Sequence, residues 1–222
     1  TWPEAMGGRG ADLLTWLIFE EEYYAADAPL RVSQNGIFLL APTIMEYGTD
    51  AQKKRFLPPM ASGEEIWAQA WSEPGAGSDM AAIRTKAIRD GDHYVISGQK
   101  TWSSRAVFAD WCFALVRTEE GSERHRGLSK ILVPLNSEGL TIRPIAQLDG
   151  KDGFAELFFD EVRVPVENLL GPEHGGWGVA MATAGFERGL LLRSPSRFQA
   201  AAKRLVQLYK DNEDRLSSGV GE

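Results

Sequence analysis

The spacing of apolar residues changes twice along this chain, and this change constrains the fold more than any other feature. Up to about Gly63 apolar residues recur at helical spacing, as at Leu13, Leu14, Leu17 and Ile18. The apolar runs then become short and rich in β-branched and aromatic residues, which is typical of strands. Helical spacing returns in the last fifty or so residues. We therefore predict an α+β protein with helices at both ends and a sheet between them.

The middle zone predicts strands that follow one another without intervening helices. The strand-like runs lie at 82–88, 93–97, 111–116, 130–133, 140–145 and 156–159. Turn sequences such as Asp90-Gly91-Asp92 separate them. Because short connections join antiparallel neighbours, we expect an antiparallel sheet in the form of a barrel or sandwich. The predicted domains are an N-terminal helical domain at 1–64, a middle β-domain at 65–171 and the start of a C-terminal helical domain at 172–222.

Capping and helix-breaking residues predict where the helices begin and end. Asp12 and Thr49 stand where the side chain of an N-cap residue is expected. The pair Pro58-Pro59 is expected to end or interrupt the helix that follows Thr49, and Pro195 to interrupt the last helical region. That last region carries an apolar face, which needs a partner layer from a further part of the protein or from another subunit. Its apolar positions are Phe198, Ala202, Leu205 and Tyr209.

Composition excludes several classes of function. The 222 residues contain 24 Lys and Arg against 31 Asp and Glu, a net charge of −7, so nonspecific binding to nucleic acid or to an anionic membrane is not expected. We expect no membrane-spanning helix, because no apolar run approaches the ~20 residues that a span needs. No targeting segment is visible, and a cytoplasmic location is expected, or the mitochondrial matrix in a eukaryote. Cys112, the only cysteine, lies in an apolar run and is expected to be a buried thiol. The three histidines are scattered, so no metal site is expected.

Residues 67–79, WAQAWSEPGAGSD, form the first stretch with chemical potential. They predict a strand that leads into a loop of small residues, where backbone amides can approach a ligand closely. Ser72 and Ser78 add hydroxyl groups, and exposed amides could bind an anion. The loop does not match the usual glycine-rich nucleotide motifs. On chemistry alone, a tight turn between two strands remains the preferred interpretation.

The second stretch is GQKTWSSRAVFAD at 98–110. Gly98-Gln99-Lys100 predicts a turn, and Trp102 follows beside Ser103 and Ser104. An indole next to hydroxyl groups suits a planar aromatic ligand, which would pack on the ring and accept hydrogen bonds at its heteroatoms. Here too a core tryptophan with surface serines is the preferred interpretation from the residues alone.

Taken together, the two stretches resemble the paired signatures of the acyl-CoA dehydrogenase family, EPxAGSD and GxKxW followed by a hydroxyl residue. Further segments match family motifs in the same order along nearly the whole chain, at 3–10, 47–58, 158–171, 175–177 and 187–188. The resemblance implies the family's fold, with most of its C-terminal helical domain absent from this chain. Arg105 departs from the family pattern, which usually has a small residue or Asn there.

The resemblance also implies that the chain binds FAD. In the family, the residue at Ser72 bonds the pyrimidine side of the flavin, and the residue at Ser78 touches the flavin phosphate or the substrate thioester. Trp102 corresponds to the tryptophan on the isoalloxazine ring, and Ser104 to the hydroxyl near its redox nitrogen. The predicted cofactor residues are Gln69, Trp71, Ser72, Gly77, Ser78, Trp102, Ser103 and Ser104.

The implied reaction is the α,β-dehydrogenation of an acyl-CoA to the trans-2-enoyl-CoA, as in fatty acid β-oxidation, with electrons passed to an electron-transfer flavoprotein. A carboxylate removes the α-proton in this family, and in a minority of members it lies just before an arginine on the first C-terminal helix. Glu187 and Arg188 match that pair, so Glu187 is the candidate base and Arg188, with Ser78, a candidate substrate contact. A surface carboxylate or an ion pair with Arg188 is the alternative.

Other readings of the resemblance remain open. An oxidase that reacts with oxygen would share these motifs, and so would a non-catalytic subunit of a heteromeric enzyme. The family implies a homodimer, a homotetramer or a heteromer. His125, Arg126 and Lys130 could approach CoA phosphates, although a solvated basic loop is the simpler interpretation.

Overall fold

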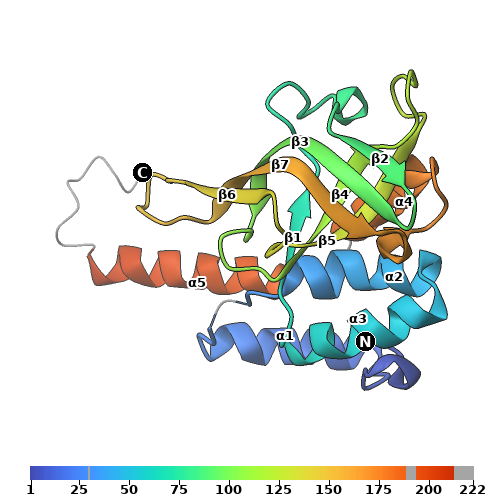
Figure 1. The fold of residues 1–222 in the computed structure, drawn as a ribbon. Coiled ribbons are helices and arrows are strands. Elements are labelled where there is room, and N and C mark those ends of the chain that lie inside the picture. The colour runs from blue at the N-terminus through green and yellow to red at the C-terminus, as the bar shows by residue number, and fades with distance from the viewer. Residues whose placement is uncertain (30, 189–193, 213–222) are drawn as a thin grey trace.

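The computed structural model describes residues 1–29, 31–188 and 194–212. Figure 1 shows a curved sheet above a group of helices. The predicted fold class is confirmed, with helices first, a sheet in the middle and helices last. The main helices are α1 Leu13–Ala25, the π-helix η2 Asn35–Leu40, α2 Ala41–Tyr47, α3 Asp50–Ser62, α4 Gly176–Glu187 and α5 Pro195–Asp211. Short 3-10 helices are η1 Glu4–Met6, η3 Met80–Ala82 and η4 Val166–Asn168.

In the described residues the sheet contains eight strands, and its order is β6-β7-β3-β2-β4-β5-β8, with β1 paired to β4 beside this path. The first four strands are β1 Trp67–Ala70, β2 Lys86–Asp90, β3 His93–Ser104 and β4 Trp111–Arg117. The other four are β5 Leu128–Pro134, β6 Leu140–Ile145, β7 Phe154–Pro165 and β8 Leu169–Leu170.

The sheet is mixed and does not close on itself, which corrects the expectation of a wholly antiparallel sheet. β1 runs parallel to β4, and Lys86 of β2 pairs in parallel with Arg117 of β4. The connection from β1 to β4 is long and contains β2 and β3, so a parallel pair is reached without a crossover helix. The entry of β1 is fixed by Asp110, whose carboxylate accepts a hydrogen bond from the amide of Ile66 at 2.7 Å.

Both predicted N-caps are confirmed. The Asp12 carboxylate accepts a hydrogen bond from the amide of Thr15 at 2.7 Å at the start of α1. Thr49 and Gln52 form a reciprocal capping box at the start of α3, in which each side chain accepts a hydrogen bond from the other residue's amide.

The prediction that Pro58-Pro59 ends or interrupts the third helix is wrong. α3 contains both prolines and continues to Ser62, where Gly63 adopts a left-handed conformation with φ +80°. Phe56, Leu57 and Met60 on the same helix are buried in the core. We attribute the continued helix to this burial, which offsets the hydrogen bonds that the prolines cannot donate.

The core has two parts, one on each face of the sheet. One part lies between the sheet and the helices, where Leu40, Ile44 and Met60 meet Phe113 and Leu132. The other part lies on the opposite face of the strands, and its buried residues include Tyr94, Ile96, Ile131, Leu157 and Val164. The helices that cover the first face therefore pack against β1 and β4 and hold these strands in place.

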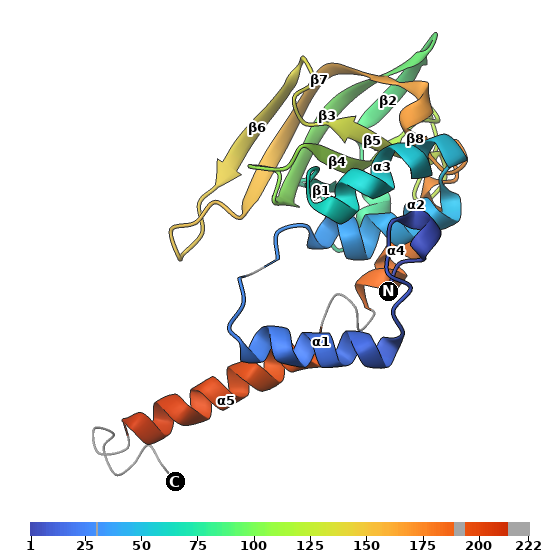
Figure 2. The same ribbon diagram turned by 90° about the horizontal axis from the view of Figure 1, so that it is seen from below.

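Helices α1 and α5 lie against one another, away from the sheet (Figure 2). Pro195 begins α5, as expected for a break before that helix, and Ser194 is its N-cap residue. The apolar face predicted on α5 is solvent-exposed in this chain: Phe198 is 63% and Leu205 68% accessible.

The predicted turn at Gly98-Gln99-Lys100 is wrong, because all three residues lie within β3. Gly98 adopts φ +148°, and the pairing of β3 with β7 shifts register between Ile96 and Gly98, as at a β-bulge. A Cβ at this position would lie 2.6 Å from the Thr85 hydroxyl and 2.7 Å from the Thr85 Cα. Glycine here therefore marks a close approach of two backbones within the sheet.

Replacing Gly98 with Ala is expected to lower the free energy of unfolding by about 1–3 kcal/mol, because the backbone at Thr85 must move to admit a methyl group. Urea denaturation measures the change. The matched control is Gly178→Ala in α4, where a Cβ would meet nothing within 4 Å. That variant is expected to be as stable as the parent or slightly more so. Equal stability of both variants would show that Thr85 does not crowd this position.

Candidate flavin site

A hollow of about 170 Å³ opens where the residues after β1 meet the end of β3. The two segments are joined directly, since the amide of Thr101 donates a hydrogen bond of 2.9 Å to the carbonyl of Ser72. The hollow is lined by Gln69, Trp71, Ser72, Thr101, Trp102 and Ser104. Two motifs about thirty positions apart in the sequence thus line the same hollow.

Two indoles of the hollow are arranged very differently. Trp71 is 6% accessible, and its ring nitrogen, a hydrogen-bond donor, has no partner among the described residues. Trp102 is 59% accessible, adopts φ +56° and contacts the Phe154 ring edge-on. A non-glycine residue in the left-handed region is strained, and strain of this kind gathers at ligand sites. The exposed face of Trp102 is therefore available to a planar ligand.

The remaining predicted cofactor residues do not line this hollow. Ser103 is fully buried, with a hydroxyl that has no partner among the described residues. Gly77 and Ser78 are exposed on the loop between β1 and η3. Thr101, in contrast, lines the hollow but was not predicted. Its position next to Trp102, in a motif rich in hydroxyl residues, could have identified it.

A buried ion pair below the hollow was also missed by the sequence interpretation. The Lys100 ammonium is fully buried and donates hydrogen bonds to the Glu73 carboxylate at 2.8 Å, the Trp71 carbonyl at 3.1 Å and the Leu115 carbonyl at 2.6 Å. The Glu73 carboxylate also accepts from the amides of Arg84 and Thr85, at 2.6 and 2.9 Å. The pair fixes the loop after Trp71 to β3, and so it sets the geometry of both walls.

The electrostatics of this pair follow from burial and mutual attraction. Burial tends to raise the pKa of Glu73, but Lys100, Thr85 and Arg84 together hold that pKa below its ordinary value. Burial lowers the pKa of Lys100 to about 8, and Glu73 opposes that shift. The signal that could have revealed the pair is one acidic and one basic residue within otherwise apolar or small-residue motifs, because charges at such positions are seldom buried unpaired.

The candidate base and its neighbour lie at the end of α4. Glu187 is the last residue of the helix and is half-buried, whereas Arg188 is the C-cap and is exposed. α4 packs against β5 and η2. The roles of Glu187 and Arg188 stay predictions.

The basic stretch after β4 is divided by the structure. His125 and Arg126 are exposed in the loop before β5, but Lys130 is fully buried in that strand and donates to the Thr183 hydroxyl at 2.6 Å. Lys130 therefore does not reach solvent to bind a CoA phosphate. Cys112 is buried as expected, and burial raises its pKa to about 12, which keeps the thiol protonated.

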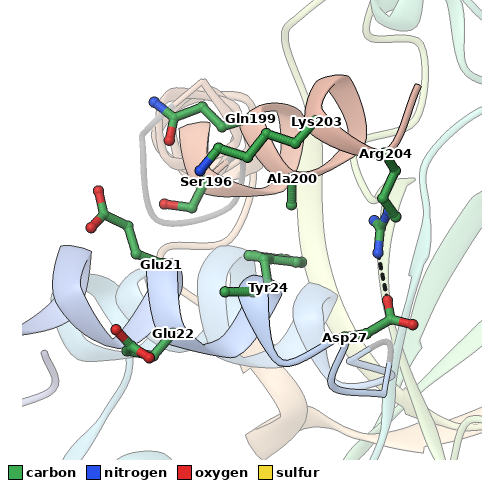
Figure 3. A pocket seen from close by; sticks show the side chains of 10 residues that line it. Glu21, Glu22, Tyr24, Asp27, Ser196, Gln199, Ala200, Lys203 and Arg204 are labelled. Carbon is green, nitrogen blue, oxygen red and sulfur yellow. Dashed lines mark hydrogen bonds and ion pairs between the residues drawn. The ribbon is translucent and has the colours of Figure 1, made fainter. Parts of the chain in front are cut away.

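A larger hollow of about 590 Å³ lies between α1 and α5 (Figure 3). Figure 3 shows Arg204 of α5 reaching toward Asp27 beyond the end of α1, and Lys203 and Glu21 also line the hollow. None of the predicted cofactor or substrate residues lines it. We do not assign the chemistry to this hollow, because size alone does not supply an aromatic platform or a converging set of hydroxyls.

Two absences apply to the described parts of the chain only. Within them, no group of three or more His, Cys, Asp or Glu side chains is placed to hold a metal ion. Likewise, none of their helices is both long and apolar enough to cross a membrane.

The residues of the smaller hollow fit an isoalloxazine ring. Trp102 offers an exposed aromatic face, Ser72, Thr101 and Ser104 offer hydroxyl groups, and Trp71 offers a ring nitrogen that lacks a partner. A flavin ring is planar, aromatic and edged with hydrogen-bond acceptors, so it uses this set of groups. The hollow has room for the edge of the ring only, so the rest of a dinucleotide would extend beyond it.

Comparisons with known proteins agree with this architecture. Residues 1–64 match the family model described as acyl-CoA dehydrogenase, N-terminal domain, and residues 68–162 match acyl-CoA dehydrogenase, middle domain. The chain is 51% identical to acyl-CoA dehydrogenase IpdE1 of Mycobacterium tuberculosis over 189 residues, 85% of this chain and 49% of that protein.

Solved structures show the same similarity. The acyl-CoA dehydrogenase from Geobacillus kaustophilus matches with a TM-score of 0.82 and 33% identity, over 100% of this chain and 58% of that one. The ChsE4-ChsE5 complex from Mycobacterium tuberculosis matches with a TM-score of 0.75 and 42% identity, over 84% of this chain and 48% of that one. The fold and these matches define a scaffold built of an N-terminal helical part and a middle sheet. The chain belongs to the acyl-CoA dehydrogenase family, and it spans about half the length of the relatives it matches.

Proposed function

We propose that the protein from which this chain comes is an FAD-dependent dehydrogenase that converts an acyl-CoA thioester to its trans-2-enoyl-CoA. The observation that carries the proposal is the meeting of Ser72 with Trp102 and Ser104 around one hollow, supported by membership of the family. Bound FAD would supply the two-electron oxidation by accepting the hydride of the β-carbon.

In this proposal the hollow orients the flavin and excludes water from one side of it. Trp102 packs on the ring, while the hydroxyls of Ser72 and Ser104 donate hydrogen bonds to acceptors on its edge. The ion pair of Glu73 and Lys100 keeps these walls at a fixed separation. Gly77 and Ser78 lie on the loop that follows Ser72, where they would meet the phosphate or thioester end of the ligands.

The proton is removed by Glu187 in this proposal. The α-proton of a thioester is weakly acidic, so its carbonyl must be polarised and the base must be shielded from water. Arg188 would pair with the carboxylate or with the substrate. An electron-transfer flavoprotein would accept the electrons. The protein would be located in the cytoplasm.

We also propose that the protein works as an oligomer. The exposed Phe198 and Leu205 on α5 favour a covering layer from another part of the protein or from a second subunit. Because one relative is named as a complex of two proteins, a heteromer is included beside a homodimer or homotetramer.

The test is the flavin absorbance of the purified protein before and after anaerobic addition of acyl-CoA substrates. We expect a flavin spectrum that bleaches with at least one of short, branched, long or steroid side-chain thioesters. Rapid return of colour with oxygen alone would favour an oxidase. Protein without flavin would favour a non-catalytic subunit and contradict the proposed function.

A further inference from the structure

Arg105 binds a distant segment of the chain at the rim of the flavin hollow. Its Nη1 donates to the Val32 carbonyl at 2.7 Å and to the Arg31 carbonyl at 3.2 Å, and its Nη2 donates to the Gln34 side-chain oxygen at 2.9 Å. In addition, the Asn35 side-chain amide donates to the Ser104 carbonyl at 3.4 Å. One guanidinium thus joins residues 31–34, which lead into η2, to the end of β3.

The backbone at the end of β3 needs such support. Trp102 has φ +56° and Arg105 has φ +70°, so two non-glycine residues within four positions are in the left-handed region. Each such residue is strained, and it persists only when surrounding contacts hold it. The register of β3 against β7 also shifts between Lys100 and Ser103, so Trp102 has no strand partner in β7, whereas Ser103 and Ser104 pair with Ala155 and Phe154. The Arg105 amide adds one anchor by donating to the Gly153 carbonyl at 3.0 Å.

The bound segment is itself fixed to α1 by a second arginine. The Arg31 guanidinium lies over the Tyr23 ring at 4.3 Å and over the Trp16 ring at 5.3 Å, with Phe19 also within range. It lies 2.5 Å from the fully buried Glu20 carboxylate. This contact has the distance of an ion pair without the alignment of a hydrogen bond. Residues 31–34 are therefore tied to α1 through the Arg31 side chain, and Arg105 binds this tied segment.

We infer that Arg105 is a positioning residue of the flavin site: by binding residues 31–34 it holds Trp102 and Ser104 in the conformation that lines the hollow, and it links this wall to α1. The inference rests on the proposed function for the identity of the ligand, but the link itself does not. Lysine cannot replace this function, because a single ammonium cannot reach carbonyl and side-chain acceptors in the fixed fork of a guanidinium.

The test compares the purified parent with Arg105→Ala, Arg105→Lys and Gln34→Ala in two measurements. Titration with FAD gives the dissociation constant, and hydrogen exchange of backbone amides reports the mobility of 31–35 and 101–105. We expect Arg105→Ala to weaken FAD binding about tenfold or more, since charge-assisted hydrogen bonds are lost. Arg105→Lys should recover only part of the affinity, and Gln34→Ala should lose less than Arg105→Ala. Exchange should rise in both segments of Arg105→Ala, with or without FAD.

Arg163→Ala is the matched control, because Arg163 makes an exposed ion pair with Asp90 at the other end of β3. It should change neither measurement at the hollow. Unchanged exchange in both segments of Arg105→Ala would overturn the inference, as would a uniform rise across the whole sheet, which indicates general destabilisation. A parent that binds no FAD but shows the expected exchange pattern would refute the proposed function and leave the positioning role intact. If the parent binds FAD and Arg105→Ala binds it with the same affinity, the positioning role is refuted and the proposed function is unaffected.

Discussion

Replacement of Lys100 by Met is expected to lower the free energy of unfolding by about 3–5 kcal/mol, the range measured when one partner of a buried ion pair is removed. The substitution removes the hydrogen bonds to Glu73, Trp71 and Leu115, and it leaves the Glu73 carboxylate buried without a cation. Denaturant unfolding followed by tryptophan fluorescence measures the loss. A loss below about 1 kcal/mol, as for an exposed pair, would contradict the role of this pair in fixing the loop.

The matched control and the rescue sharpen this test. Arg163→Met breaks the exposed pair with Asp90 and should cost at most about 1 kcal/mol. The double variant Lys100→Met with Glu73→Leu replaces both charges with apolar side chains, and should recover part of the stability lost in the single variant. Without recovery, the hydrogen bonds to Trp71 and Leu115 would be the main contribution of Lys100.

The same pair gives stability a dependence on acid pH. The pKa of Glu73 is lowered in the folded state, so its contribution is fully present above the ordinary value of 4.5 and is lost as pH falls through the lowered value. In Lys100→Met the attraction that lowers this pKa is absent. The free energy of unfolding of Lys100→Met should therefore fall less steeply than that of the parent as the pH is lowered below about 5.

Replacement of Glu187 by Gln is expected to slow dehydrogenation by about 10²–10⁴-fold, the usual contribution of a positioned general base. The change keeps the size of the side chain and removes its ability to take the α-proton. The measurement is the rate at which the flavin bleaches on anaerobic mixing with the best acyl-CoA substrate. FAD affinity should stay unchanged, because no cofactor contact is assigned to Glu187.

A second carboxylate provides the control for Glu187. Glu138 is exposed in the turn before β6, so Glu138→Gln should bleach at the parental rate. A parental rate in Glu187→Gln as well would place the base elsewhere in the protein, and would leave the flavin site itself unaffected.

Local signals in the sequence predicted local structure well. The caps at Asp12 and Thr49 depend on a few neighbouring residues, so the sequence contains all that is needed to identify them. The change from helical to strand spacing likewise places the sheet between helices, because each period reflects which side of an element is buried. β6 was predicted with the bounds that the structure has, 140–145.

The errors occurred where distant parts of the chain decide local structure. Pro58 and Pro59 lie inside α3, where burial of Phe56 and Leu57 outweighs the local preference of proline. Gly98 lies within β3 rather than in a turn, and glycine is needed there because Thr85, the residue before β2, lies against it, a contact that spacing along the sequence does not reveal. β1 also pairs in parallel with β4 although β2 and β3 lie between them in the sequence, so this pairing joins distant parts of the chain.

The candidate site was predictable in part. Resemblance identified Trp71, Ser72, Trp102 and Ser104, which lie around one hollow. The contribution of Thr101 was missed, and so was the function of Lys100 as a buried partner of Glu73, because both depend on the register of β3 against the loop.

The central claim is that the hollow between Ser72 and Trp102 receives the isoalloxazine ring. A crystal structure of the protein grown with FAD tests it most directly. The account predicts the ring packed on the face of Trp102, with Ser104 or Ser72 within hydrogen-bond distance of its edge. A flavin ring bound elsewhere, with this hollow filled by protein side chains, would contradict the account.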